Sequence, residues 1–371
     1  MNLEFSDDQK FIQKSAREYL DANCGLEVCR GVLESDASYS DNLWKGLAEM
    51  GWLGAAVPES YGGSGMGQLE LVLIAQEMGR ALAPVPFASS VYLATEAILL
   101  YGSEDQKKRW LPRLAKGDAI GTFALHEGVG DLELGETTLR FDGGAVTGVK
   151  LPVLDGDVAS LAIVLARDGA AHSLCLVDLA GAGVTRTKLA SFDPSRSQAK
   201  IAFAGAKAEL LGQSGQGVAQ TERVLDRAAV LMGFEQIGSS ERALDITRDY
   251  TMSRYAFGRA VASFQSIKHR MADWYGRNQI ALSNGYWAAW ALSTGSPELG
   301  LAACNVRVAA SEAFLIGSQE MVQMHGGVGF TWEFDCHLFY RRAQLLSLAL
   351  GSPSAWREKL VRRIEHTNQA A

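Results

Sequence analysis

The chain is poor in cysteine and in proline, with five cysteines and eight prolines among 371 residues. The cysteines are odd in number and scattered, and they lack the short paired spacings of metal sites and disulfide-stapled domains. They are Cys24, Cys29, Cys175, Cys304 and Cys336. We therefore expect reduced thiols, no metal site, and stability that comes from a hydrophobic core.

An excess of positive charge is also missing, because the formal net charge is -7. Proteins that bind nucleic acid need a basic surface to displace counterions from the phosphates. Nucleic-acid binding is therefore disfavoured. A phosphate-bearing ligand stays possible, since local arginines and helix N-termini bind anions even on an acidic protein.

Neither a secretory signal nor a membrane span is evident. The first twenty residues mix apolar and charged side chains rather than placing a basic segment before an apolar run. The most apolar helical segments are interrupted by Arg, Glu or Asp before they reach the length of about 18 residues that a span requires. The sequence predicts a cytoplasmic protein that does not cross a membrane.

The spacing of apolar residues changes twice along the chain. It is helical over 6–116, apart from a glycine-rich loop at 58–65. Short β-rich runs such as 159–165 and 173–177 follow, separated by glycine and aspartate. Helical periodicity then returns, with long segments predicted at 218–252, 263–293, 297–325 and 335–348.

This pattern predicts an α+β fold in three parts. We expect an N-terminal α-helical domain at 1–117, a middle β domain at 118–213, and a C-terminal domain resembling a four-helix bundle at 214–371. The long helices are apolar around much of their circumference, so they must bury more than one face. Subunit contacts, and hence a multimer, are expected.

The first motif follows a long predicted helix and reads Arg-Tyr-Ala-Phe-Gly-Arg over 254–259. Gly258 suits a helix-ending position, and Arg254 offers the forked donor that fits a diphosphate. Gln265, shortly afterwards, could bond a sugar or a ring edge. A helix–loop–helix corner with solvated basic side chains would read the same way, so the residues alone leave both interpretations open.

The second motif reads Gln-Met-His-Gly-Gly-Val-Gly-Phe-Thr-Trp-Glu over 323–333. Three glycines within four residues at a helix end permit positive φ and a close backbone approach to a ligand. A plain helix cap would use one glycine. Cofactor contact and a structural loop both remain open.

These two motifs, in this order and spacing, resemble the acyl-CoA dehydrogenase family. The likeness extends over nearly the whole chain, including the loop at 58–65, the segment at 102–112 and the β insert. It implies a helical, β, helical fold, FAD as cofactor, and α,β-dehydrogenation of an acyl-CoA thioester. It further implies electron-transfer flavoprotein as the electron acceptor.

The resemblance also assigns residues to a flavin held mainly by a neighbouring subunit. The matching positions are Arg254, Phe257, Gln265, Gln323, Gly326 and Gly327. Ala256 stands where relatives usually have threonine or serine, so one hydrogen bond to the cofactor is expected to be missing.

The catalytic base is harder to find. Removing the α-proton of a thioester needs a carboxylate in a dry pocket, where desolvation raises its pKa. Relatives place it before a Gly-Thr pair near the C-terminus, where this chain has Leu350, or early in the long helix, where it has Ala228. Glu235 lies about two helical turns beyond Ala228 on roughly the same face and is the remaining candidate. A buried structural acid or a subunit contact is the alternative interpretation of Glu235.

The loop that would hold the chain's own flavin is altered as well. Relatives show Thr-Glu followed by Gly-Ser-Asp, whereas 125–131 reads Leu-His-Glu-Gly-Val-Gly-Asp. His126 replaces a small hydroxyl, and no serine precedes Asp131. Features that serve a neighbour's flavin are thus retained, while those that serve the chain's own flavin and substrate are changed.

The chain accordingly resembles one subunit of the α2β2 heterotetrameric dehydrogenases of bacterial steroid side-chain breakdown. We expect a second subunit to supply the base and a bulky acyl-CoA to be the substrate. Three alternatives stay open: a self-sufficient homotetramer that uses Glu235, an acyl-CoA oxidase, and a non-catalytic relative.

Overall fold

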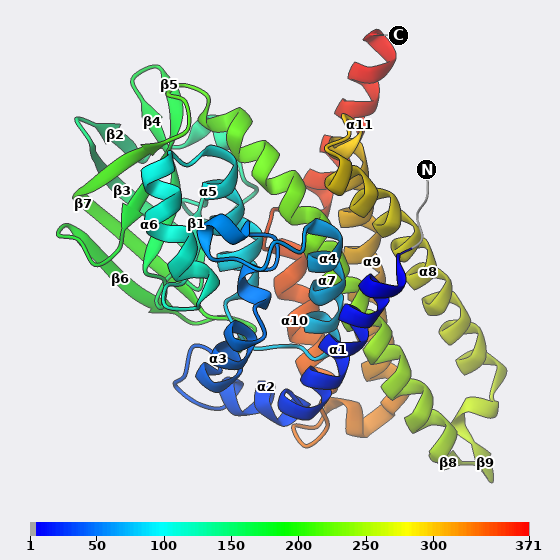
Figure 1. Cartoon of the computed structure of the whole chain (residues 1–371). Coiled ribbons are helices and arrows are strands. Elements are labelled where there is room, and N and C mark those ends of the chain that lie inside the picture. Colours follow the sequence, from blue (N-terminus) through cyan, green and yellow to red (C-terminus); the bar gives the residue numbers. More distant parts are fainter. Residues whose placement is uncertain (1–4, 371) are drawn as a thin grey trace. The chain divides into compact units, whose positions relative to one another are not determined.

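The computed structural model describes residues 5–370, and its elements follow the order helices, strands, helices (Figure 1). The predicted α+β fold class is confirmed. The chain forms two compact units built from separate segments. Unit 1 comprises Met1–Arg30, Val72–Ala83 and Ala229–Ala371, and unit 2 comprises Gly31–Leu71 and Pro84–Ala228. The three domain boundaries expected from the sequence remain a prediction.

Three helices of unit 2 precede its strands, and the first residues of α7 (Gly217–Ser253) follow them. These three helices are α3 (Asp41–Glu49), α5 (Glu96–Tyr101) and α6 (Glu104–Ala115), with a buried π-helical segment at Ala88–Thr95. At the start of α6, Ser103 accepts a hydrogen bond from the backbone N–H of Gln106, whose side chain bonds back to Ser103. This reciprocal capping box satisfies two backbone donors that a helix start leaves unpaired.

The strands of unit 2 form one seven-stranded sheet. They are β1 (Gly121–Ala124), β2 (Arg140–Asp142), β3 (Ala145–Leu154), β4 (Leu161–Asp168), β5 (Ala171–Asp178), β6 (Val184–Leu189) and β7 (Gln198–Leu211). The order is β1-β4-β2-β3-β7-β5, with β6 paired to β7 and β4 also paired to β5. The path from β4 through β2, β3, β7 and β5 therefore returns to β4, which leaves few free edges.

Unit 1 is helical. It contains α1 (Asp7–Asn23), most of α7 (Gly217–Ser253), α8 (Gln265–Thr294), α9 (Leu299–His325), α10 (Cys336–Leu348) and α11 (Pro353–Ala370). The four long segments predicted from periodicity match α7 to α10 within about two residues at each end. The sequence analysis did not single out α11, which packs against α9.

Helix α9 is central to unit 1, because α8, α10 and α11 all pack on it. Small residues allow close approach: a Cβ on Gly317 would lie 2.2 Å from the indole nitrogen of Trp274.

The expectation that no segment is apolar enough to span a membrane was wrong, as judged by length and composition alone. The helical segment Leu299–Phe330 contains an 18-residue window with a mean hydropathy of 1.4, and half of this window is buried inside the fold. Its apolarity is explained by contact with three helices.

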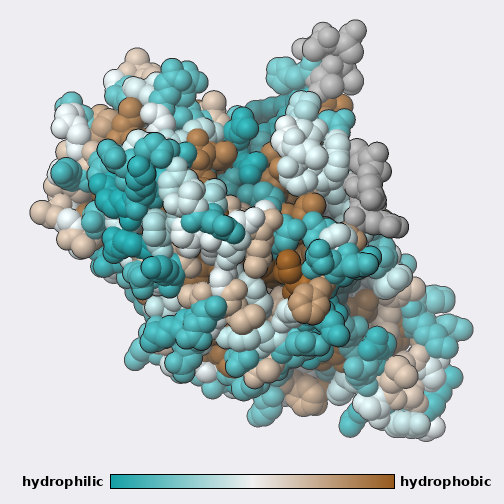
Figure 2. Space-filling model, in the orientation of Figure 1, coloured by the Kyte–Doolittle hydropathy of each residue, from teal (hydrophilic) through white to brown (hydrophobic). Residues whose placement is uncertain are grey.

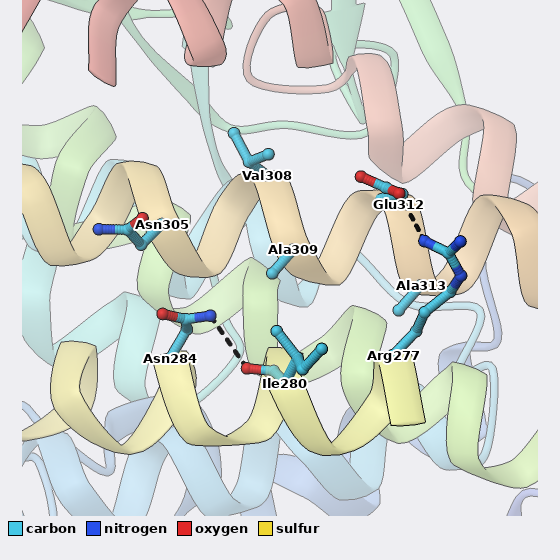
Figure 3. Close-up of a pocket in the computed structure, with 8 residues that line it drawn as sticks. All are labelled: Arg277, Ile280, Asn284, Asn305, Val308, Ala309, Glu312 and Ala313. Carbon is cyan, nitrogen blue, oxygen red and sulfur yellow. Dashed lines mark hydrogen bonds and ion pairs between the residues drawn. The ribbon is translucent and has the colours of Figure 1, made fainter. Parts of the chain in front are cut away.

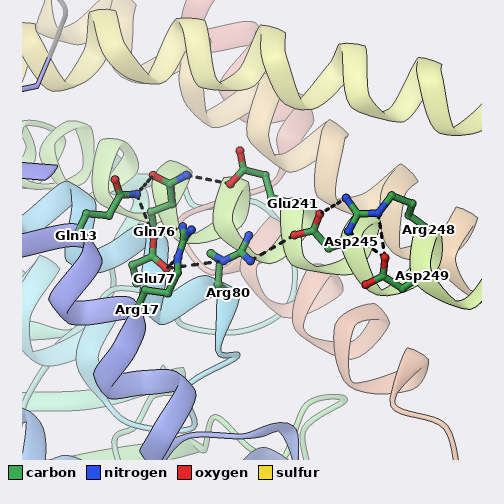
Figure 4. Close-up of polar contacts among 9 residues, drawn as sticks. All are labelled: Gln13, Arg17, Gln76, Glu77, Arg80, Glu241, Asp245, Arg248 and Asp249. Atoms are coloured by element: carbon green, nitrogen blue, oxygen red, sulfur yellow. Dashed lines mark hydrogen bonds and ion pairs between the residues drawn. The ribbon is translucent and has the colours of Figure 1, made fainter. Parts of the chain in front are cut away.

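A chain of polar contacts joins α1, α4 (Gln68–Arg80) and α7 within unit 1 (Figure 4). The Glu77 carboxylate is buried and accepts a hydrogen bond from the Arg17 guanidinium at 2.7 Å. Arg80 lies 3.7 Å from the same carboxylate and 3.3 Å from that of Asp245. Because each buried charge has an opposite partner, three helices are held in a fixed register.

All five cysteines are buried, and none of them forms a disulfide. Burial raises the pKa of the Cys24, Cys175 and Cys336 thiols to about 12. They are therefore protonated at neutral pH and poor nucleophiles. Over residues 5–370, no three His, Cys, Asp or Glu side chains gather as metal ligands would.

Candidate functional site

The first motif forms a hairpin at one end of α7 (Figure 1). Helix α7 ends at Ser253, and strands β8 (Tyr255–Ala256) and β9 (Arg259–Ala260) pair antiparallel. The two-residue loop between them is Phe257-Gly258, with φ of 53° and 79°. Positive φ at both positions is the geometry of a type I′ turn. The sequence analysis was therefore wrong to place Gly258 at a helix end, because the glycine serves the hairpin turn.

Phe257 is the unusual residue in this turn. Type I′ turns favour Asn, Asp or Gly, and a bulky residue at positive φ carries backbone strain. Its ring is 97% exposed and meets the Phe264 ring edge-on, at 6.4 Å between centroids. Strain of this kind persists at functional sites. Exposure and a strained backbone together make Phe257 a candidate contact residue.

The second motif caps α9. Gly326 has φ of 64° and donates its N–H to the carbonyl of Gln323, and a short 3-10 helix follows over Gly326–Phe330. A Cβ added at Gly326 or Gly327 would meet nothing within 4 Å, whereas one at Gly329 would lie 2.4 Å from the Val322 carbonyl oxygen. Packing explains Gly329 and backbone conformation explains Gly326. Neither explains Gly327, whose backbone is left open to a close approach from outside.

The structure brings the two motifs together. The Tyr250 ring, in the last turn of α7, stacks on the ring of His325, in the last turn of α9, at 4.2 Å between centroids. Arg254 follows Tyr250 by one turn and donates its N–H to the Tyr250 carbonyl at 2.8 Å. Arg270 of α8 pairs with Glu320 of α9 at 2.6 Å. Residues about 70 positions apart in the chain thus share one end of unit 1.

We call the six residues assigned to a neighbour's flavin the corner face. They are Arg254, Phe257, Gln265, Gln323, Gly326 and Gly327, and each is exposed in the isolated chain. Within residues 5–370, no carboxylate forms an ion pair with Arg254. The corner face therefore offers a forked cation, two side-chain amides, an exposed ring and unobstructed backbone, which together suit a phosphate-bearing ligand.

The loop at 125–131 lies in unit 2 and is organised around a buried ion pair. The Lys150 ammonium is fully buried, 2.7 Å from the Glu127 carboxylate and 3.0 Å from the Leu125 carbonyl oxygen. Glu127 also accepts hydrogen bonds from Thr138 and from the backbone N–H of Leu139 at 3.0 Å. Both carboxylate oxygens of Glu127 thus accept hydrogen bonds from the chain itself, which disfavours a role as base.

Burial of Glu127 favours its neutral form, yet Lys150, Thr138 and Leu139 together lower its pKa to about 2 from an ordinary 4.5. A carboxyl group with a depressed folded-state pKa stabilises the protein above its unfolded-state pKa and loses this effect as pH falls through the folded-state value. We therefore expect unit 2 to lose stability between about pH 4.5 and pH 2. Thermal unfolding across this range should show a smaller decline for Glu127→Gln than for the wild type. Equal declines would contradict this role for the pair.

His126 neighbours this pair and is mostly buried. Burial first, and then the nearby Lys150 charge, lowers the pKa of its imidazole below 6.5, so the ring is neutral at pH 7. A pocket of about 190 Å³ opens beside it, with Asp131, Glu133 and Glu136 among its lining residues. This acidic rim disfavours the phosphates of a cofactor. The altered loop is thus less suited to a flavin nucleotide than the corner face.

Both places where relatives carry the base hold buried apolar side chains. Ala228 is fully buried in α7, and Leu350 is 5% exposed just beyond α10. The Leu350 carbonyl accepts a hydrogen bond from the Trp356 indole at 3.0 Å, which fixes this segment. Neither position can take a proton.

Glu235 lies in the interior of unit 1 with 2% of its surface exposed. Its backbone abuts α4, where a Cβ on Gly79 would lie 1.9 Å from the Glu235 carbonyl oxygen. Burial lowers the pKa of the neighbouring Arg307 to about 9, and the charge of Glu235 opposes that shift. Whether Glu235 also takes a substrate proton stays a prediction.

The sequence analysis missed Arg307. This guanidinium, 1% exposed, donates to the Gln236 side chain at 2.7 Å and to the Leu346 and Ser347 carbonyls at 2.5 and 3.1 Å. It therefore ties α7 and α9 to the end of α10. A single arginine in the apolar stretch of α9 was the available signal, since a buried charge requires a partner.

A separate pocket of about 300 Å³ lies between α8 and α9 (Figure 3). Arg277 of α8 pairs with Glu312 of α9 at 2.6 Å on its wall, and Ile280 and Val308 add apolar surface. It contains none of the corner-face residues.

The face of the molecule that Figure 2 shows is mostly hydrophilic, with apolar residues in small separate areas.

Comparison with known proteins agrees with this geometry. Residues 6–118 match the model of the acyl-CoA dehydrogenase N-terminal domain, and residues 215–365 match that of the C-terminal domain. The acyl-CoA dehydrogenase IpdE2 of Mycolicibacterium smegmatis is 32% identical, with 97% of this chain and 98% of the relative covered.

Two solved complexes contain similar chains. One is the ChsE4-ChsE5 complex from Mycobacterium tuberculosis, with 27% identity, a TM-score of 0.90, and 98% and 99% of the two chains covered. The other is a variant of the Tcur3481-Tcur3483 steroid acyl-CoA dehydrogenase, with 28% identity, a TM-score of 0.90 and the same coverage.

Members of the matched family are oxidoreductases that act on the CH–CH bond of an acyl-CoA, and FAD is their cofactor. The two domain matches, and a relative that aligns over nearly the whole chain, agree with the observed order of helices and strands. This chain therefore belongs to the acyl-CoA dehydrogenase family.

Proposed function

We propose that this chain is one subunit of a heteromeric, FAD-dependent acyl-CoA dehydrogenase. It completes a flavin site held mainly by an unlike partner subunit, and that partner supplies the catalytic base. The observation that carries the proposal is the corner face. Its residues gather at one end of unit 1, all exposed, and include a strained aromatic and a glycine that the chain's own packing does not require.

The base argument supports an unlike partner rather than a second copy. Leu350 and Ala228 are buried and apolar where relatives carry a carboxylate, and Glu127 is bound to Lys150. A second copy would bring the same deficiencies. The relatives ChsE4-ChsE5 and Tcur3481-Tcur3483 are each described as a pair of different proteins.

In this assembly the bound FAD would accept hydride from the β-carbon of the acyl-CoA. The chain's own residues bind and orient. The Arg254 guanidinium would donate to diphosphate oxygens, and Gln265 and Gln323 would offer amides for polar edges. Gly326 and Gly327 would let the backbone approach closely, while the Phe257 ring would exclude water from the contact.

We propose a bulky, steroid-type acyl-CoA as substrate, because one similar complex is described as a steroid acyl-CoA dehydrogenase. Electron-transfer flavoprotein is the proposed electron acceptor and the cytoplasm the proposed location. Both rest on the family resemblance.

Coexpression tests the proposal. The chain would be produced alone and together with a candidate second subunit, the product of a neighbouring gene, and each preparation examined for a flavin spectrum. Dye reduction would then be measured with straight-chain, branched and steroid CoA esters. We expect the single chain to be colourless or insoluble, and the copurified pair to be yellow and active with a bulky ester.

A second candidate is a homotetramer in which Glu235 is the base, favoured by the burial of this carboxylate in α7. It predicts a single chain that is yellow, reduces dye with an acyl-CoA, and loses that activity in Glu235→Gln. This result would replace the heteromeric assignment.

A further inference from the structure

We infer that Tyr250 is a positioning residue that holds the two halves of the corner face in register. The inference rests on the proposed function. One half, around Arg254 and Phe257, belongs to the end of α7 and the β8–β9 hairpin, and the other, around Gly326 and Gly327, belongs to the end of α9. A cofactor that spans both halves requires a fixed spacing between them.

Tyr250 contacts both halves directly. Its carbonyl oxygen accepts the Arg254 N–H at 2.8 Å, and its hydroxyl donates to the His325 carbonyl at 3.3 Å. The two rings stack at 4.2 Å with an interplanar angle of 20°. Tyr250, four positions before Arg254, is thus linked directly to His325, which immediately precedes Gly326.

The His325 ring is itself fixed. Its Nδ1 lies 2.7 Å from the Met321 carbonyl oxygen, which can only accept, so Nδ1 carries the proton in the neutral ring. Burial lowers the pKa of His325, and the backbone bond to Met321 opposes this, so the ring is neutral at pH 7. A fixed, neutral ring is a firm platform for the tyrosine.

Further aromatic and ionic contacts hold the chain beyond the glycines. Phe334 meets the Tyr250 ring edge-on at 6.0 Å and the His325 ring at 6.3 Å. Arg30 donates to the Trp332 carbonyl at 2.7 Å and pairs with Asp335 at 2.6 Å. The glycine-rich segment is therefore anchored at both ends, by Tyr250 before it and by Arg30 after it.

The test uses the coexpressed, FAD-binding enzyme. Tyr250→Leu removes the ring stack, and Tyr250→Phe keeps the stack while removing the hydroxyl. We expect Tyr250→Leu to weaken FAD binding by about 10-fold or more in titrations of the apo complex, a typical loss for a supporting contact of a bound group. The turnover number at saturating FAD should stay within about two-fold, because binding is lost rather than chemistry.

Tyr250→Phe should keep the FAD affinity within about three-fold of the wild type, because ring stacking supplies most of the force that holds the two halves of the corner face together. Tyr275→Leu is the matched control, since this α8 tyrosine is 56% exposed and lies outside the corner face. Phe334→Ala changes a partly exposed ring and should weaken FAD about three-fold, which provides a test if Tyr250→Leu does not fold.

The outcomes separate this inference from the proposed function. If Arg254→Ala weakens FAD binding while Tyr250→Leu and Phe334→Ala do not, the positioning role is wrong and the heteromeric site stands. If Arg254→Ala also leaves FAD binding unchanged, the proposed function itself fails. If Tyr250→Leu lowers the melting temperature without changing FAD affinity, the role of Tyr250 is purely structural.

Discussion

Replacing Glu235 with leucine is expected to lower the free energy of unfolding by about 1–3 kcal/mol, because it removes a carboxyl group whose charge favours the buried Arg307 cation. The remaining Arg307 is 1% exposed and lies in a helical core. Burial lowers the pKa of Arg307, and the charge of Glu235 opposes this fall. Denaturant unfolding of the assembled enzyme, monitored by circular dichroism, would measure the change.

Glutamine at the same position separates structure from catalysis. Glu235→Gln keeps the shape and a hydrogen-bonding group while it removes the charge and the ability to take a proton. If Glu235 is a counter-ion of Arg307, activity per folded enzyme should stay within a few-fold and stability should fall. If Glu235 is the base, activity should fall by a factor of about 10² or more while stability changes little.

A double variant gives an independent check. Adding Arg307→Met to Glu235→Leu removes both charges, so the combined loss of stability should be smaller than the sum of the two single losses. Some loss would remain, because Arg307 also bonds the Leu346 and Ser347 carbonyls. Strictly additive losses would show that the two side chains do not interact.

Periodicity alone placed four of the helices of unit 1, α7 to α10, but not α11. The bounds of α7 to α10 follow from apolar spacing, because long helices repeat the same signal over many turns. The sharp reversal after Ser253 was not predicted. A Phe-Gly pair is a poor turn signal, and only the observed φ of 53° at Phe257 reveals the hairpin.

The candidate site was named largely by resemblance, and the structure supplies what the sequence could not show. Periodicity does not reveal that Tyr250 reaches His325, because that contact joins two helices far apart in the chain. The burial of Arg307 beside Glu235 was also invisible, since helical spacing does not say which face is enclosed by other helices. Long-range side-chain pairing sets these features.

The glycines of the second motif allow the sharpest test of the corner face. Gly327→Val should barely change the stability of the chain, because its Cβ would meet nothing within 4 Å and the backbone is not left-handed there. In the assembled enzyme the same side chain would occupy the space proposed for the cofactor. Overpacking of about 1–3 kcal/mol would weaken FAD binding by roughly 5- to 150-fold.

Gly329→Ala is the matched control with the opposite expected pattern. A Cβ there would lie 2.4 Å from the Val322 carbonyl oxygen, so the end of α9 must shift and stability should fall by about 1–3 kcal/mol. FAD titration and thermal unfolding of both variants would distinguish the two glycines. If Gly327→Val binds FAD as tightly as the wild type, the open space above Gly327 does not face the cofactor, and the corner face cannot be the flavin contact that we propose.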